Sequence, residues 1–248
     1  MNNRHVLSII VVVTCFIFIC KDTKAQNYDA NFNKPISTQR GQFVYVELPP
    51  IKTEAGVLYF LDRNLGATST NPETSDSWGD LYQWGRNTDG HEKRYSDTTL
   101  TKSSIAEVPH NKFIVDEQKS NDWLTDSEES LWQGQNGVNN PCPCGYRLPT
   151  QKEWRAVLNL GYEVKLNPSG YYYLSIDGGK LILPCAGLRS AYTGNFQHIG
   201  TRGYYWASDA INKGTSGCID FNKEEFTTNI SIFGFRCFGR SIRCVRSE

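Results

Sequence analysis

Residues 140–154 read NPCPCGYRLPTQKEW and join two closely spaced cysteines to the start of a helix. Thr150 can serve as the N-cap, and Glu153, three residues later, completes a capping box. Gly161 supplies a stop signal. The apolar face between these signals comprises Trp154, Val157 and Leu158. The pattern therefore predicts an α-helix that begins after Thr150 and ends before Gly161.

The two cysteines of this stretch, Cys142 and Cys144, are expected to pair with distant partners. Asn140 and Cys142 each precede a proline, which extends the backbone and leaves the two thiols on roughly the same side. A bond between them is geometrically poor, and the late cysteines Cys237 and Cys244 are natural partners, with Cys185 and Cys218 forming a second set. Closing a loop of roughly 100 residues stabilises a protein by about 4 to 5 kcal/mol in the chain-entropy model.

The first 25 residues are predicted to be a secretory signal peptide. A basic start precedes an uncharged run, residues 6–20, which is followed by the polar KDTKA. That run is short for a membrane span, and Ala25 is a small residue before the expected cleavage site. The alternative is a lipoprotein anchored through Cys15 or Cys20, although neither follows the small residue that usually precedes a lipid-modified cysteine. We therefore expect an exported chain with no transmembrane span in its mature part.

The six cysteines outside this leader favour disulfides over a metal or redox site. Zinc-binding pairs are usually separated by two to four residues, whereas CPC has one intervening residue and the last two cysteines have six. A redox pair would have two intervening residues. In an exported chain the even number favours disulfides, with the pairing open among Cys142, Cys144, Cys185, Cys218, Cys237 and Cys244.

The length and the charge of the chain limit the classes of protein to which it can belong. The chain has 248 residues with 26 basic and 26 acidic side chains, and the leader holds three of the former and one of the latter, so the mature net charge is near −2. This balance does not favour a nucleic-acid binder, which normally carries a basic patch. Residues 26–40 are polar and unpatterned. We therefore expect a flexible lead there and one domain over residues 41–248.

The remaining patterns predict an α+β fold with short helices and a mainly antiparallel sheet. QFVYVEL (42–48) and GVLYFLD (56–62) are aromatic and β-branched runs typical of strands. Within residues 78–85, helical spacing predicts a short amphipathic helix through Trp78, Leu81, Tyr82 and Gly85. From residue 171 onward, short β runs alternate with glycines.

The final run, residues 230–246, has the period of a half-buried strand. In its first part Phe233, Phe235 and Cys237 alternate with Gly234, Arg236 and Phe238. After a restart at Gly239, Ile242 and Cys244 fall on one face and Arg243 on the other.

Few residues suggest catalysis. His91, His110 and His198 have no metal-binding spacing and are expected to be surface or loop residues. No Gly-x-Ser-x-Gly elbow occurs, and neighbouring acids such as Glu128 and Glu129 are typical of solvated faces. The sequence predicts no catalytic residue, no metal ligand and no cofactor.

The loop AGLRSAYTGNFQHIGTRGYYW, residues 186–206, is the strongest candidate for a binding surface. It mixes aromatic, cationic and polar side chains that suit sugar stacking or protein contacts. The alternative is a loop folded onto its own core. Trp206, which is followed by the small residues Ala207 and Ser208, is expected to be buried in the core. The candidate ligand-binding residues are Arg189, Tyr192, Asn195, Phe196, His198, Arg202 and Tyr204.

Six motifs occur in order along residues 41–248: DRNLGA, GDLYQWGRNTDGHE, NDWLT..EESLWQGQNGVNNPCPCGYRLPTQKEW, LPCAGLRS, GYYWASD and GRSIRCV. Together they resemble the Fibrobacter succinogenes major paralogous domain of exported and surface proteins in Bacteroidetes-type bacteria. GYRLPTQKEW and GFRC are also similar to the formylglycine-generating enzyme superfamily, whose fold is a variant of the C-type lectin fold. This resemblance implies that long loops display a binding surface, that N- and C-terminal strands lie together, and that Arg147 and Trp154 serve the core.

Two departures from these relatives bear on function. The enzymes bind copper through a reactive cysteine pair near the C-terminus, whereas Cys237 and Cys244 are spaced differently. Calcium-dependent lectins carry EPN or QPD before WND, whereas this chain has NPE at 71–73 and NDW at 121–123. We therefore expect an exported, non-enzymatic binding or adhesion module that presents loop residues to a glycan or protein at the cell surface. The alternatives are an oxidoreductase of the formylglycine-generating type and a structural surface or fimbrial component.

Overall fold

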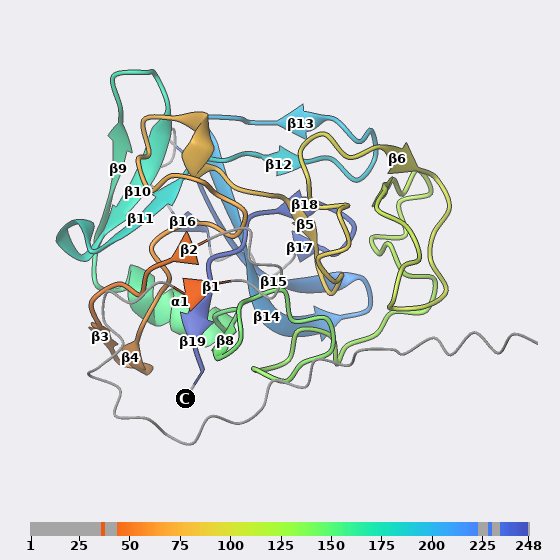
Figure 1. The fold of residues 1–248 in the computed structure, drawn as a ribbon, viewed down its shortest axis with the longest axis horizontal. Helices are drawn as coiled ribbons and strands as arrows, with labels where there is room; N and C mark the ends of the chain where they lie inside the picture. The colour runs from red at the N-terminus through yellow and green to blue at the C-terminus, as the bar shows by residue number, and fades with distance from the viewer. Residues whose placement is uncertain (1–35, 38–43, 223–227, 230–233, 248) are drawn as a thin grey trace, which may run out of the picture.

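Short, mostly antiparallel strands surround one α-helix in the part of the chain that the computed structural model describes, residues 36–37, 44–222, 228–229 and 234–247 (Figure 1). Before the helix lie β1 (Ile36–Ser37), β2 (Val44–Tyr45), β3 (Ile51–Thr53), β4 (Gly56–Leu58), η2 (Ser75–Ser77), β5 (Tyr82–Gln83), β6 (Thr98–Thr99), β7 (Phe113–Ile114) and β8 (Tyr146–Arg147). The α+β class with a mainly antiparallel sheet is thereby confirmed.

The helix α1 (Gln151–Leu158) opens the second half, which contains the longest strands, β14 (Arg202–Asn212) and β15 (Thr215–Asn222). The other strands after α1 are β9 (Tyr162–Leu166), β10 (Tyr172–Ile176), β11 (Leu181–Pro184), β12 (Leu188–Arg189), β13 (Phe196–Gln197), β16 (Thr228–Asn229), β17 (Gly234–Phe235), β18 (Gly239–Arg240) and β19 (Val245–Arg246), and a short 3-10 helix, η3 (Asp177–Gly179), follows β10, as η2 is a 3-10 helix before α1. One sheet has the order β11-β10-β9, and another has the order β13-β12-β18-β5. The second sheet brings the candidate binding loop beside the late run of the chain.

The hairpin β14–β15 separates two hydrophobic cores. Its register pairs Tyr205 with Ile219 and Trp206 with Cys218, so successive residues point to opposite faces. Tyr205 and Ile219 join the core that contains α1. Trp206, fully buried as predicted, joins the opposite core. That core is rich in tryptophan and includes Trp84, Trp123 and Trp132.

The predicted capping box is confirmed at the start of α1. Glu153 N donates to Thr150 Oγ1 at 3.1 Å, and Thr150 N donates to Glu153 Oε2 at 2.7 Å. Arg147 fixes the same carboxylate, with Nη2 2.7 Å from Oε1. Gly161 follows the helix at φ +93°, a conformation that glycine adopts without strain. The fully buried Trp154 anchors the helix on its core.

The end of the chain closes against the early strands, as the family resemblance implies. Phe60 bridges Val245, and Leu61 N donates to the Cys244 carbonyl at 3.0 Å. Cys142 forms a disulfide with Cys244, 102 residues away, with a Cα–Cα distance of 5.9 Å. The predicted long-range partner of Cys142 is thus confirmed. Both cysteines of CPC are oxidised, because Cys144 is disulfide-bonded as well.

Three of the six cysteines predicted to form disulfides do not form them. Cys185, Cys218 and Cys237 carry fully buried thiols, and burial raises the pKa of Cys185 and Cys237. Cys185 packs in the core that contains α1, where a reduced cysteine behaves as a small apolar side chain. The expectation that every cysteine outside the leader serves as a cross-link is therefore wrong.

The helix predicted over residues 78–85 is also wrong. The chain forms η2 just before Trp78 and β5 at Tyr82–Gln83. Gly79 and Gly85 have φ of +68° and +86°, which a right-handed helix does not allow. Leu81 and Tyr82 are both buried. The spacing of the apolar residues therefore reflects contacts with the core that an irregular segment makes, and not a helix.

The late run buries its arginines as well as its apolar residues. Arg236 and Arg243 are each 1% exposed, which differs from the one-sided strand that the alternation predicts. Arg243 Nη2 donates to Asn64 Oδ1 at 2.9 Å and to the Ile182 carbonyl at 2.8 Å. The Arg236 guanidinium lies 4.3 Å from the Trp84 ring centroid. Hydrogen bonds and aromatic faces replace water around both cations.

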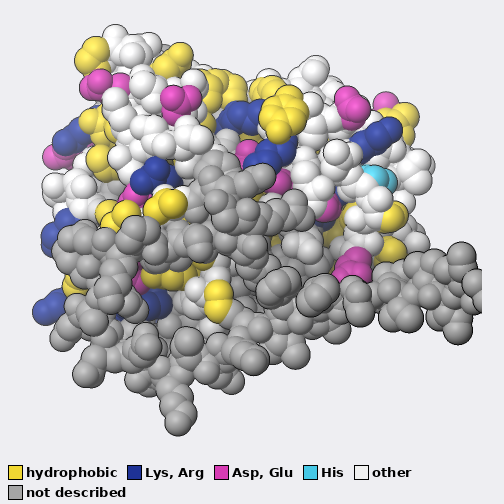
Figure 2. Space-filling view, viewed as in Figure 1, with side chains coloured by type: hydrophobic (Ala, Val, Ile, Leu, Met, Phe, Trp, Pro, Cys, Tyr) yellow, Lys and Arg dark blue, Asp and Glu magenta, His cyan; other side chains and the backbone are white. Residues whose placement is uncertain are grey.

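Other expectations meet the structure only in part. Within the segment 26–40, predicted to be a flexible lead, Ile36–Ser37 pair with β2. The predicted signal peptide lies outside the described residues. No helix in the described ranges is long and apolar enough to cross a membrane. Figure 2 shows basic and acidic side chains intermixed on one face, in keeping with the balanced composition.

Candidate functional site

An open groove of about 430 Å³ lies where two loops leave the parallel pair β6–β7. Val115 N donates to the Thr99 carbonyl at 2.8 Å, so the residues that follow each strand lie side by side. The groove is lined by Leu100, Lys102, Val115, Asp116, Glu117 and Gln118. Its wall thus combines an apolar base with an ammonium group, two carboxylates and an amide.

A hydrogen-bond chain holds one side of the groove in place. Lys102 Nζ donates to Ser120 Oγ at 2.6 Å, and Ser120 Oγ donates to Asp116 Oδ1 at 3.0 Å. The other oxygen of Asp116 accepts from Asn121 N at 2.8 Å. Both oxygens of Asp116 are therefore held by hydrogen bonds within the protein, whereas Glu117 is exposed and presents its carboxylate to solvent.

An aromatic shelf, made of Tyr192, Phe235 and Phe238, adjoins the groove. Asp116 N donates to the Ala191 carbonyl at 2.7 Å, which fixes Tyr192 next to the groove wall. The Tyr192 and Phe238 ring centroids are 5.2 Å apart at 85°, and Phe235 lies 6.3 Å from Phe238. All three rings are half-buried. The shelf therefore presents half-buried aromatic faces beside the groove.

The structure divides the seven candidate residues of the loop among several environments, and only Tyr192 lies beside the groove. Arg189 is buried, stacks on Phe113 at 4.4 Å and donates to the Ser96 carbonyl at 2.8 Å. It therefore supports the fold. Phe196 is 40% exposed, with the Arg189 guanidinium 5.6 Å from its ring. Asn195 is exposed at the turn of the β12–β13 hairpin.

The last three candidates form a cluster of their own. Tyr204 is buried and its hydroxyl lies 2.6 Å from His198 Nδ1. The Arg202 guanidinium lies 5.4 Å from the Tyr204 ring and pairs with Asp220 at 2.5 Å. His198 is exposed and Arg202 is half-buried, so the cluster reaches the surface through these two.

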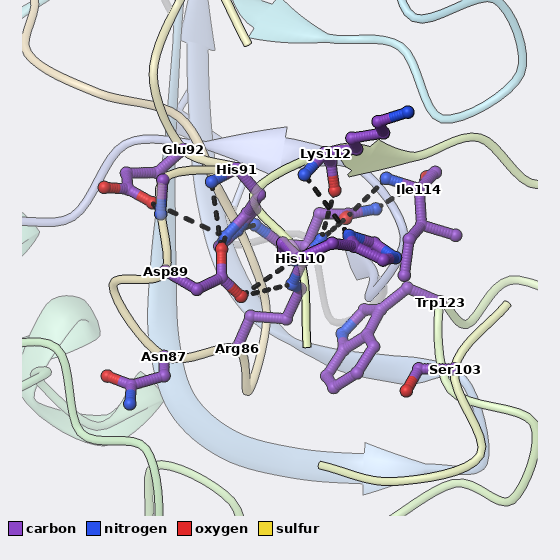
Figure 3. Close-up of polar contacts among 12 residues, drawn as sticks. Arg86, Asn87, Asp89, His91, Glu92, Ser103, His110, Lys112, Ile114 and Trp123 are labelled. Carbon is purple, nitrogen blue, oxygen red and sulfur yellow. Dashed lines mark hydrogen bonds and ion pairs between the residues drawn. The ribbon is translucent and has the colours of Figure 1, made fainter. Parts of the chain in front are cut away.

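Asp89, His91 and Glu92 place three potential metal ligands within 4.8 Å of one another. Figure 3 shows Asp89 between His91 and Arg86, with dashed contacts to both. His91 Nε2 accepts from Gln83 N at 3.0 Å, so in the neutral ring Nδ1 carries the proton and donates to Asp89 Oδ1 at 2.7 Å. A metal on Nδ1 would move this proton to Nε2, where it would face the Gln83 N–H. The group fits a structural support better than a metal site.

His91 lies in a loop, as expected, but it is fully buried and so is not a surface residue. Burial, with a smaller contribution from the charge of Arg86, lowers the pKa of His91 to about 4. Arg86 itself donates to Asp89 Oδ2 at 2.8 Å and to the carbonyls of Lys112 and His110 at 3.0 and 3.3 Å (Figure 3). The cluster therefore ties the β5 turn to the loop that precedes β7. The spacing Arg-x-x-Asp-x-His gave no signal for this role.

Searches of protein-family models, curated proteins and solved structures find no match to this chain.

Proposed function

We propose that the protein is an exported, non-enzymatic binding module that holds a glycan or protein ligand in the groove beside the aromatic shelf. The observation that carries the proposal is the juxtaposition of Tyr192 and Phe238 with a polar groove of about 430 Å³. Apolar ring faces supply contact area, while Lys102, Glu117 and Gln118 supply hydrogen bonds that select the ligand.

The cysteines favour this role over the copper chemistry of the formylglycine-generating enzymes. Cys244 is bonded to Cys142, and Cys237 is a buried thiol whose pKa is raised by burial. Copper binding at this pair would require a reduced Cys244 and an accessible thiolate at Cys237. The C-type lectin-like arrangement implied by the resemblance remains part of the proposal, supported by the contact between early and late strands.

The test is a glycan array and a peptide-binding screen with the full chain, followed by affinity measurements on the best ligand. Tyr192→Ala should weaken binding by roughly tenfold or more, as loss of an aromatic anchor does. Tyr95→Ala is the matched control, because Tyr95 is 86% exposed and lies outside the shelf. Equal affinity of Tyr192→Ala and the wild type would overturn the assignment of the groove. Catalytic turnover without ligand retention would overturn the binding role.

A further inference from the structure

Arg240 is a buried cation that makes no hydrogen bond to any residue that the structure describes. It is 8% exposed, and its Cζ lies 4.7 Å from the Trp206 ring and 5.4 Å from the Tyr204 ring. Its Nε is inaccessible to solvent and makes no hydrogen bond. Across the described residues, no carboxylate approaches its guanidinium within ion-pair distance and no oxygen accepts from it.

The other buried arginines show how this fold normally satisfies a guanidinium. Each donates to at least two oxygen atoms of carbonyl, amide, hydroxyl or carboxylate groups. These arginines are Arg86, Arg189, Arg236 and Arg243. Arg240 has the aromatic contacts of this set but none of its hydrogen bonds. An unpaired buried charge is costly, so the exception points to a partner that the described residues do not supply.

The strand pairing places an unpaired acceptor near this cation. Tyr204 and Asp220 are opposite each other in β14–β15, and side chains of such a pair are neighbours on one face. Asp220 Oδ2 accepts from Arg202, whereas Oδ1 is buried with no hydrogen bond. Tyr204 is thus flanked by an open donor group on Arg240 and an open acceptor on Asp220.

We propose that Arg240, Tyr204 and Asp220 form a binding site for a hydroxy-carboxylate, namely a uronic-acid-type unit of an acidic glycan. The planar guanidinium matches a carboxylate through two parallel N–H···O bonds. A hydroxyl next to that carboxylate donates to Asp220 Oδ1, and the buried Tyr204 ring holds the Arg240 guanidinium beside the site. The site uses β14, β15 and β18, not the groove residues, so it stands whether or not the groove binds a ligand.

The test follows the Arg240 Nε–H signal of the ¹⁵N-labelled full chain by NMR during titration with glucuronate, glucose, acetate and an acidic peptide. Glucuronate should shift this signal saturably and bind at least tenfold more tightly than acetate, while glucose leaves it unchanged. Arg240→Gln should weaken glucuronate binding at least tenfold. The control is Arg155→Gln, which removes the same charge from an exposed position of α1 and should bind like the wild type.

Asp220→Asn separates the two halves of the site, because it should reduce the preference for glucuronate over acetate while acetate binding persists. The wild-type titration decides the matter even if Arg240→Gln fails to fold. A glucuronate titration that leaves the Arg240 signal unmoved would refute the site. Acetate or the acidic peptide binding as tightly as glucuronate would refute the sugar assignment. Loss of glucuronate binding in Tyr192→Ala, with Arg240→Gln unaffected, would place acid recognition in the groove and overturn this proposal.

Discussion

The Cys142–Cys244 disulfide should supply a large share of the stability of the domain. The bond closes a loop with a sequence separation of 102. In the chain-entropy model a loop of this length restricts the unfolded chain by about 4.7 kcal/mol at 25 °C. Domains of this kind are stable by about 5–15 kcal/mol in total. Replacing both cysteines with alanine should therefore leave the protein marginally folded.

The measurement is the free energy of unfolding in urea of the Cys142→Ala/Cys244→Ala variant and the wild type. Mutation is preferable to a reducing agent, because a reductant would also break the disulfide of Cys144. Cys185→Ala is the matched control, since it removes one fully buried sulfur that is not in a bond and should cost on the order of 1 kcal/mol. The double variant should lose about 4 kcal/mol more of its free energy of unfolding than twice the loss in Cys185→Ala. If the double variant lost no more than twice the Cys185→Ala value, the entropic reasoning would be refuted.

Two further predictions concern local stability and its dependence on pH. Thr150→Ala removes the oxygen that accepts from Glu153 N and should lower the free energy of unfolding by about 1 kcal/mol. Thr150→Ser keeps a hydroxyl oxygen and should retain most of this stability. Equal losses of stability in the two variants would contradict the capping role. Burial lowers the pKa of His91 to about 4 from its ordinary 6.5, so its contribution is fully present above pH 6.5 and is lost as pH falls toward 4. Between pH 7 and pH 5 the free energy of unfolding of the wild type should fall by about 2 kcal/mol because of this group, and the His91→Gln variant should lack this fall. If urea unfolding showed the same pH dependence of stability for the wild type and the variant, His91 would not be buried in its neutral form.

Features set by a few neighbouring residues could be predicted from the sequence. The capping box of α1 depends on Thr150 and Glu153, which are three residues apart and satisfy each other's backbone groups. The geometry of Cys142 beside Cys144 predicted that Cys142 has a distant partner. It did not predict which of the distant cysteines is that partner, because this depends on the fold. Trp206 was predicted to be buried, because a tryptophan followed by small residues in a strand is typical of a core.

Features that depend on long-range contacts could not be predicted from the sequence. The apolar spacing of Trp78, Leu81 and Tyr82 is the same for a helix and for a bent segment packed on several sides, and Gly79 at φ +68° decides between them. The groove is formed by the ends of β6 and β7. No local sequence pattern predicts that these two strands pair in parallel. Of the candidate loop residues, only Tyr192 lies at that groove, because the hairpin β12–β13 turns its side chains toward different neighbours.

Buried arginines explain both why the alternation of the last run was misleading and why the long loops are ordered. A guanidinium has five donors and no acceptor, so burying one requires several oxygen atoms at fixed positions. The fold takes many of them from loop carbonyls: Arg86 holds the segment around Lys112, Arg189 holds Ser96, and Arg236 holds Glu128. Each such bond fixes a loop that has few backbone partners of its own. Arg240 makes no such bond among the described residues, which is why we propose that its donors bind an acidic ligand.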